Sequence, residues 1–273
     1  MREFAEAFLL VFAELAVGGL FSLSIPPFHQ IERGFYKSTA AVYLAAGAVA
    51  LSGWSYLLAT RGVDPASLSY RLVELAIWGA FLAVFTVYFR SLWGEHHRLR
   101  ARSYTSALLL GFIAVAATAL RYSPPTIVGF ALYPVAFGAS ALLLGAASTG
   151  MLLGHWYLID VGLTLTPLLR VQRFFVTAIH LQMAISALTV VSALAGMLAT
   201  GSLARLWENH SLLVILRVSL GPVAAYGLAW MIRRTLAVPQ TMAATGLFYI
   251  AVLSVVVGEI LGRTILFRTS LPL

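Results

Sequence analysis

Two ionisable side chains lie four residues apart inside an apolar run near the end of the sequence. They are Glu259 and Arg263, within residues 241–267. Residues at i and i+4 share one face of a helix, so a carboxylate and a guanidinium at this spacing can pair. A charge inside a membrane is costly without a partner, and its presence there is typical of a functional site. We therefore interpret these residues as part of a polar site on a membrane helix.

Three further ionisable residues, Glu14, Glu74 and Arg217, interrupt other apolar runs. A buried carboxylate can take up and release protons, and an arginine can stabilise negative charge on a bound group. The structural alternative is that Glu259 and Arg263 only lock their helix to Arg217 or Glu74, or that Glu74 reaches the lipid headgroups. Which interpretation holds depends on the helices that position these side chains.

The composition is that of an integral membrane protein. Of the 273 residues, 60% are hydrophobic and 10% are charged, and the mean hydropathy is +0.91; a soluble domain of this length needs more polar surface. The absence of cysteine excludes disulfides and iron–sulfur clusters ligated by this chain. We attribute the net charge of +8 to loop arginines that fix topology, and we expect no binding of nucleic acid.

Eight apolar runs are long enough to cross about 30 Å of hydrocarbon as helices. We expect one all-α transmembrane domain over residues 1–273. The start of the chain lacks a basic region and a cleavage site, so we expect the first run to be retained. The predicted spans are 5–26, 39–60, 71–92, 103–121, 127–159, 172–198, 211–232 and 241–267.

An even number of spans places both termini on one side of the membrane, and basic residues indicate which side. The side opposite the termini holds Arg33, Lys37, Arg90, Arg98, Arg100, Arg102, Arg170, Arg173, Arg233 and Arg234. The terminal side holds Arg2, Arg61, Arg71, Arg121, Arg205 and Arg268. The side opposite the termini thus has ten basic residues and the terminal side six, and the side richer in basic residues is normally the cytoplasmic one. We therefore predict a multi-pass protein of the cell inner (cytoplasmic) membrane with both termini on the outer, periplasmic side.

This topology places all five intramembrane charges in the outer half of the bundle. Glu74 lies in the first outer turn of the third span, and Arg217 about two turns into the seventh. The eighth span carries Glu259 and Arg263 to the same side, and Glu14 lies near mid-depth. We expect these side chains to face one another or a hydrated cavity rather than lipid.

Two histidines form a second candidate site on the inner side. His155 is near the end of the fifth span and His180 near the start of the predicted sixth, so we expect both at similar depth. Such a pair can ligate a b-type haem or take up protons near a quinone. The alternative is an interfacial aromatic belt in which each imidazole is a hydrogen-bonding partner. His96 and His97 lie in a basic loop without the ligand spacing of a metal site, and we predict no metal.

The last span resembles the membrane-anchor subunit of dimethyl sulfoxide reductase and of the related polysulfide reductase. Its sequence Gly-Glu-x-x-Gly-Arg, with Phe267 beyond it, carries this similarity. Weaker similarities lie around Glu74, around Glu14 with the Ala16-Val17-Gly18-Gly19 stretch that follows it, and at Arg217. Topology matches over nearly the whole chain, whereas the residues match in short patches.

The resemblance implies a subunit that exchanges electrons between membrane quinone, either menaquinone or ubiquinone, and an iron–sulfur partner subunit on the outer face. A larger catalytic subunit, often a molybdopterin enzyme, would lie beyond that partner. Glu74 and Glu259 would handle protons or hydrogen-bond the quinone, with Arg217 and Arg263 as charge partners and Glu14 as a relay. This chain would contribute no catalytic residue to the terminal reaction, because the redox groups belong to the quinone and the partner.

Three alternatives stay open at this point. One is a cytochrome subunit that binds haem b through His155 and His180. Another is a small-solute or ion transporter with the charged residues along its path, although no paired broken helices or inverted repeat are evident. The third is a purely structural anchor in which the buried charges serve assembly.

Overall fold

The computed structural model describes residues 2–61, 65–160, 162–198 and 202–273. All regular secondary structure in these ranges is helical, and eight helical segments are long and apolar enough to cross a membrane. The elements are α1 (Arg2–Ser22), α2 (Arg33–Arg61), α3 (Pro65–Ser91), α4 (His97–Leu120), α5 (Ile127–Trp156), α6 (Thr166–Leu194), α7 (Ser202–Val218), the π-helix η1 (Ser219–Val223), α8 (Ala224–Ala237) and α9 (Thr241–Thr269). Eight such segments indicate a multi-pass membrane protein, as the sequence predicts.

Most of the helices extend beyond the predicted apolar runs. Helix α2 begins at Arg33 rather than at residue 39, α4 at His97 rather than 103, and α6 at Thr166 rather than 172. A helix that ended at its last apolar residue would leave end N–H and C=O groups unpaired in hydrocarbon, so it continues through polar residues to the membrane surface, where water can pair them. Several arginines assigned to inner loops therefore lie on helix ends. The side chains of Arg2, Arg61 and Arg205, counted on the terminal side, lie outside the described part of the chain.

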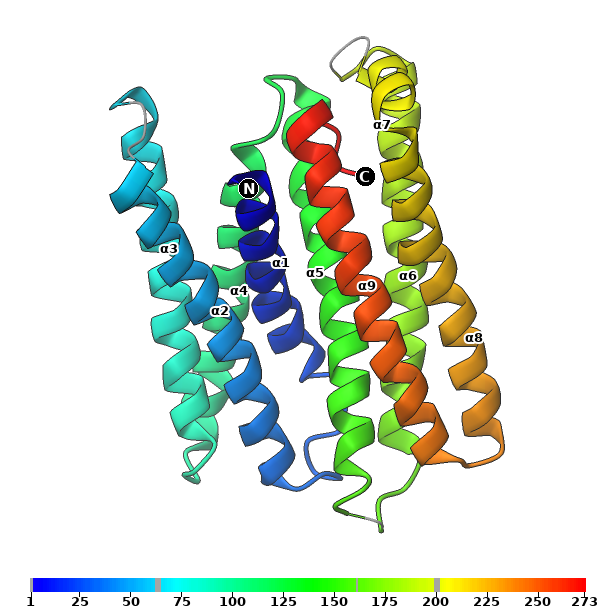
Figure 1. Ribbon diagram of the computed structural model, residues 1–273. Helices are drawn as coiled ribbons and strands as arrows, with labels where there is room; N and C mark the ends of the chain where they lie inside the picture. Colours follow the sequence, from blue (N-terminus) through cyan, green and yellow to red (C-terminus); the bar gives the residue numbers. More distant parts are fainter. Residues whose placement is uncertain (1, 62–64, 161, 199–201) are drawn as a thin grey trace.

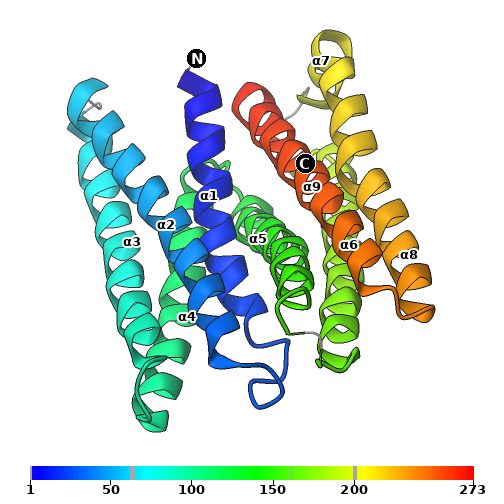
Figure 2. The same ribbon diagram turned by 60° about the horizontal axis from the view of Figure 1, so that its bottom comes forward.

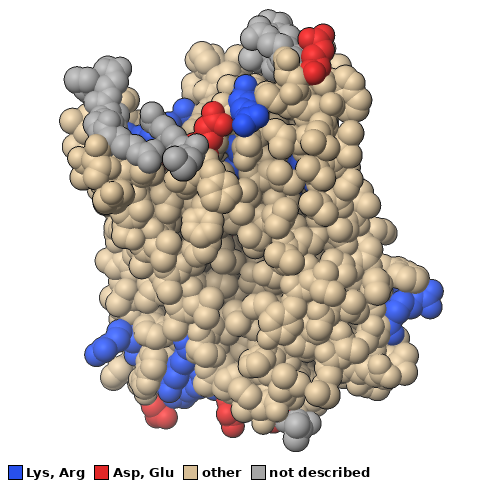
Figure 3. Space-filling model, viewed as in Figure 1, with Lys and Arg blue, Asp and Glu red and all other residues tan. Residues whose placement is uncertain are grey.

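Helix α5 lies at the centre of the bundle. It packs against α1, α4, α6 and α9, with α1 to α4 on one side of it and α6 to α9 on the other (Figure 2). Both ends of the chain lie at the same end of the bundle (Figure 1), which agrees with an even number of spans. Charged side chains gather at the two ends of the visible face and leave an uncharged band between them (Figure 3). Such a band suits a hydrocarbon environment.

Small residues bring α1 and α5 into close contact. A Cβ atom added at Gly18 would lie 1.6 Å from the carbonyl oxygen of Ala141, and one added at Gly145 would lie 2.1 Å from the backbone of Gly18. Glycine lets two helix backbones approach until their main chains touch. The small residues of these two spans therefore form a close packing surface between α1 and α5.

We expect Gly145→Ala to destabilise the protein, because its methyl group has no room against α1. Overpacking of this kind typically costs about 1–3 kcal/mol. The matched control is Gly138→Ala in the same helix, where an added Cβ atom would meet nothing within 4 Å. Thermal unfolding in detergent should show a lower midpoint for Gly145→Ala only. Equal midpoints for the two variants would contradict the close contact.

The seventh span is interrupted, which its apolar run did not predict. His210 has non-helical backbone angles (φ −140°, ψ 23°) inside α7, and the π-helix η1 contains Pro222. Proline lacks an N–H and its ring crowds the preceding turn, so the backbone widens there. The Leu220 carbonyl oxygen accepts a hydrogen bond from the Ser254 hydroxyl of α9. In contrast, α5 continues through Pro134 as one helix.

Candidate functional site

Glu14 of α1 and Arg263 of α9 form an ion pair in the interior of the bundle. They are 1% and 2% exposed. The guanidinium also lies over the ring of Phe137, with its carbon 3.8 Å from the ring centroid. Within the described residues, Oε2 of Glu14 and Nε of Arg263 have no hydrogen-bond partner. The pair thus keeps one acceptor and one donor that a water or a ligand can use.

Glu259 of α9 pairs with Arg217 of α7 at 2.9 Å. These side chains are 1% and 4% exposed. Arg217 also donates a hydrogen bond from Nε to the Leu273 carbonyl oxygen, at 3.2 Å. Residues 270–273 fold back against the helices: the Tyr133 hydroxyl donates to the Ser270 carbonyl, and Leu271 is buried. The guanidinium therefore joins α7, α9 and the segment that follows α9.

Glycines make the space that Arg217 occupies. Cβ atoms added at Gly221, Gly258 and Gly262 would lie 2.8, 3.1 and 3.0 Å from atoms of its guanidinium group. Gly221 and Gly258 also let η1 and α9 cross closely, because a Cβ atom on Gly258 would lie 2.7 Å from the Gly221 Cα atom. The two glycines of the Gly-Glu-x-x-Gly-Arg sequence thus have a steric role beside the Arg217–Glu259 pair.

The i, i+4 spacing predicted that Glu259 and Arg263 could pair with each other, but each pairs with a residue of another helix. The Glu14 carboxylate also interacts electrostatically with Glu259 and Arg217. We call Glu14, Arg217, Glu259 and Arg263 the four-charge cluster. With two carboxylates and two guanidinium groups it is formally neutral, which lowers the cost of burying it. The structure therefore brings together four of the five predicted site residues.

Glu74 lies in a separate group between α3 and α4. Its carboxylate, 3% exposed, accepts hydrogen bonds from the Thr118 hydroxyl at 2.7 Å and from Arg121 at 2.9 Å. Arg71 lies 3.9 Å from it on the same helix. We call Glu74, Thr118 and Arg121 the Glu74 group. Thr118 and Arg121 were not predicted as site residues; Arg121 ends the predicted fourth span and was counted only among the basic residues of the terminal side.

Aromatic rings connect the Glu74 group with the four-charge cluster. Arg121 donates a hydrogen bond to the Tyr122 hydroxyl, and burial raises the pKa of that hydroxyl, so it stays protonated at neutral pH. The Tyr122 ring stacks on Phe137 with centroids 6.3 Å apart and an interplanar angle of 22°. Phe137 in turn lies beneath Arg263. All five predicted charged residues thus belong to one connected polar and aromatic region.

The two histidines do not lie at similar depth, and that prediction is wrong. His155 is the second-last residue of α5, whereas His180 is fourteen residues after the start of α6, about 21 Å along the helix. His155 contacts the Tyr249 hydroxyl at 3.3 Å, and His180 bonds the Val176 carbonyl at 2.8 Å and packs on Tyr226. The error came from starting the sixth span six residues late. This geometry gives no support to one haem shared by both imidazoles.

The described residues include no group of three or more His, Cys, Asp or Glu side chains that could hold a metal ion. Neither a scan against protein-family models nor a search of curated proteins finds a match for the chain. Any functional assignment therefore depends on the chemistry of the buried charges.

Proposed function

We propose that this protein is the membrane-anchor subunit of a multisubunit oxidoreductase and exchanges electrons between membrane quinone and an iron–sulfur partner subunit. The observation that carries the proposal is the connected region formed by the Glu74 group, Tyr122 and the four-charge cluster. Three buried carboxylates, each paired with an arginine, lie among membrane helices where unpaired polar groups are costly. The resemblance of the last span to the anchor subunits of dimethyl sulfoxide and polysulfide reductases supports it.

The chemistry of quinone exchange fits these residues. Oxidation of a quinol releases two protons and two electrons, so a site needs groups that accept protons and hydrogen-bond the two oxygens. Glu74 lies at the edge of the bundle beside the half-exposed α3 surface, and its partner Arg121 is partly exposed. Glu14 Oε2 and Arg263 Nε offer a further acceptor and donor deeper inside. The electrons would pass to the partner subunit, because this chain has no cysteine to ligate a cluster.

The proposed orientation follows the basic residues. Both termini and the Glu74 group would face the periplasm, where the iron–sulfur subunit and a larger, often molybdopterin-containing, catalytic subunit would dock. The membrane would be the inner one, and the quinone either menaquinone or ubiquinone. A structural anchor is the second candidate, favoured by the formal neutrality of the four-charge cluster.

The test is quinol-dependent turnover of the intact complex isolated from its own membrane. We expect Glu74→Gln to lower this turnover about 100-fold or more, because the amide oxygen can keep one of the two hydrogen bonds but the amide cannot accept a proton. The control is Glu95→Gln, which removes an exposed carboxylate at the other end of α3. Turnover with an artificial electron donor to the iron–sulfur subunit should be unchanged in both variants.

Other outcomes distinguish the alternatives. Unchanged quinol turnover in Glu74→Gln and in Glu259→Gln would overturn the site. Loss of assembly without a change in turnover per assembled complex would favour the structural anchor. A Soret band that disappears in His155→Ala would indicate a cytochrome subunit, and solute uptake by the isolated chain in liposomes would indicate a transporter.

A further inference from the structure

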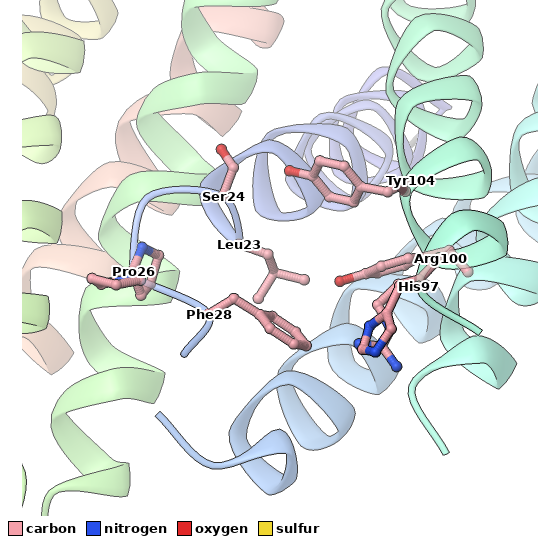
Figure 4. Close-up of a pocket in the computed structure, with 10 residues that line it drawn as sticks. Leu23, Ser24, Pro26, Phe28, His97, Arg100 and Tyr104 are labelled. Carbon is pink, nitrogen blue, oxygen red and sulfur yellow. The ribbon is translucent and has the colours of Figure 1, made fainter. Parts of the chain in front are cut away.

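A cavity of about 380 Å³ lies at the opposite end of the bundle from the four-charge cluster. Helix α1 ends at Ser22, well short of the lower end of α2, and the chain after it descends between the lower parts of α2 and α5 in the view of Figure 1. Residues of this connecting segment face side chains of α4 across the cavity (Figure 4). The cavity is lined by Leu23, Ser24, Pro26, Pro27, Phe28, Tyr88, His97, Arg100, Ala101 and Tyr104.

The framework of the cavity is held by hydrogen bonds. The Tyr104 hydroxyl donates to the Leu20 carbonyl at 3.0 Å, in the last turn of α1. The Tyr36 hydroxyl donates to the Pro26 carbonyl at 3.0 Å. Arg100 Nη2 donates to the Gly94 carbonyl at 2.6 Å and to the Ser91 carbonyl at 3.3 Å, at the end of α3. These hydrogen bonds therefore fix the chain around the cavity at the ends of α1 and α3.

Arg100 leaves part of its hydrogen-bonding capacity unused. It is 8% exposed, and its Nε has no partner among the described residues. Its guanidinium carbon lies 5.2 Å from the Phe28 ring centroid, so the charge sits against an apolar wall. An arginine in such a place presents donors suited to phosphate or carboxylate oxygens.

The surroundings favour an anionic ligand. The cavity lining contains no carboxylate, and it contains His97 as a second donor. Arg33 repels the positive charge of Arg100, and Glu95 attracts it. Further basic residues, Arg98 and Arg102, occupy the same helix end. The remaining lining residues are mainly apolar, which suits a hydrocarbon chain.

We infer that this cavity binds an anionic phospholipid, with its phosphate at Arg100 and His97 and an acyl chain against Leu23 and Phe28. The depth agrees with this ligand, because the end of α3 and the start of α4 lie where a membrane span meets the headgroup region. A basic pocket between membrane helices is a known type of site for lipid headgroups. The inference is independent of the quinone function, since it uses none of those residues.

The experiment uses the purified full chain after removal of lipid with detergent. Native mass spectrometry would measure binding of phosphatidylglycerol, phosphatidylcholine and inorganic phosphate. We expect phosphatidylglycerol to bind about tenfold or more tightly than phosphatidylcholine, because both carry the phosphate but the choline cation is repelled by the positive charge of Arg100. Arg100→Gln should remove this preference. Ala101→Phe should block the cavity while leaving the α3 end intact, which keeps the test decisive if Arg100→Gln does not fold.

The matched control is Arg102→Gln, which removes an exposed positive charge from the same helix end without touching the cavity lining. Its phosphatidylglycerol affinity should stay within about twofold of the unmodified chain, since exposed charges contribute little. Equal binding of the two lipids, or unchanged binding in Ala101→Phe, would overturn the inference. Inorganic phosphate binding as tightly as the lipid would refute the acyl-chain contact, and preference for a quinone over phosphatidylglycerol would refute the ligand class.

Discussion

Glu14→Gln should destabilise the folded protein by about 3–5 kcal/mol, because it leaves the Arg263 charge buried without its carboxylate. Arg263 is 2% exposed, so bulk solvent compensates little for the lost carboxylate. Phe137 beneath the guanidinium would supply only part of the missing interaction. Equilibrium unfolding in mixed detergent micelles measures the change.

The same two helices provide the control for this prediction. Glu3 of α1 and Arg268 of α9 also pair, at 3.5 Å, but their side chains are 54% and 42% exposed. We expect Glu3→Gln to cost less than about 1 kcal/mol, because solvent screens an exposed pair. The double variant Glu14→Gln with Arg263→Gln should lose less than the sum of the single variants, since it removes both charges. A loss in Glu14→Gln no larger than that in Glu3→Gln would contradict a buried pair.

The number of spans followed from hydropathy because a membrane helix must satisfy its backbone hydrogen bonds within itself. The ends of the helices did not follow, since nothing in the apolar count marks where a polar first turn begins. For α6 the predicted start was six residues late, equivalent to about 9 Å along the helix. Together with the end of α5, predicted at residue 159 and found at Trp156, that error made the depths of His180 and His155 appear similar.

The partners of the buried charges were beyond sequence reasoning for a different reason. Helical periodicity shows that Glu259 and Arg263 share a face, but it does not say which neighbouring helix presents a counter-charge to each. The close contact of α1 with α5, set by Gly18 and Gly145, is part of the packing that surrounds Glu14 and Arg263. Arg121 was not recognised as a site residue because it is the last residue of its predicted span, where an arginine is explained by topology alone.

The interruption of the seventh span also has a visible cause in the sequence, namely Pro222. What the sequence did not indicate is its relation to Arg217, which lies in the turn before η1 and fills the space left by glycines of η1 and α9. A π-helical turn re-aims the side chains around it. The widened turn and the Arg217–Glu259 pair therefore form one structural unit.

We expect replacement of Arg217 to lower the stability of the protein more than replacement of Glu259. Arg217→Met should cost about 3–5 kcal/mol, because it leaves the Glu259 carboxylate buried and unpaired and removes the hydrogen bond to the Leu273 carbonyl. Glu259→Gln should cost less, about 1–3 kcal/mol, because Arg217, unlike Arg263, keeps a second hydrogen-bond partner in the Leu273 carbonyl. Equilibrium unfolding of both variants, with Arg173→Gln on the exposed side of α6 as the control, measures the difference.

Hydrogen exchange gives this asymmetry a local readout. In Arg217→Met the segment 270–273 should lose protection, since one of the contacts that holds it against the helices is the bond from the Arg217 guanidinium to Leu273. In Glu259→Gln its protection should stay close to that of the unmodified protein. If both variants lost the same free energy of unfolding and kept the same protection of residues 270–273, Arg217 would act only through Glu259. Its hydrogen bond to Leu273 would then contribute nothing measurable. Unequal costs with local loss of protection would instead make Arg217 the residue that ties the interrupted seventh span, α9 and the chain beyond it into one rigid wall beside the four-charge cluster.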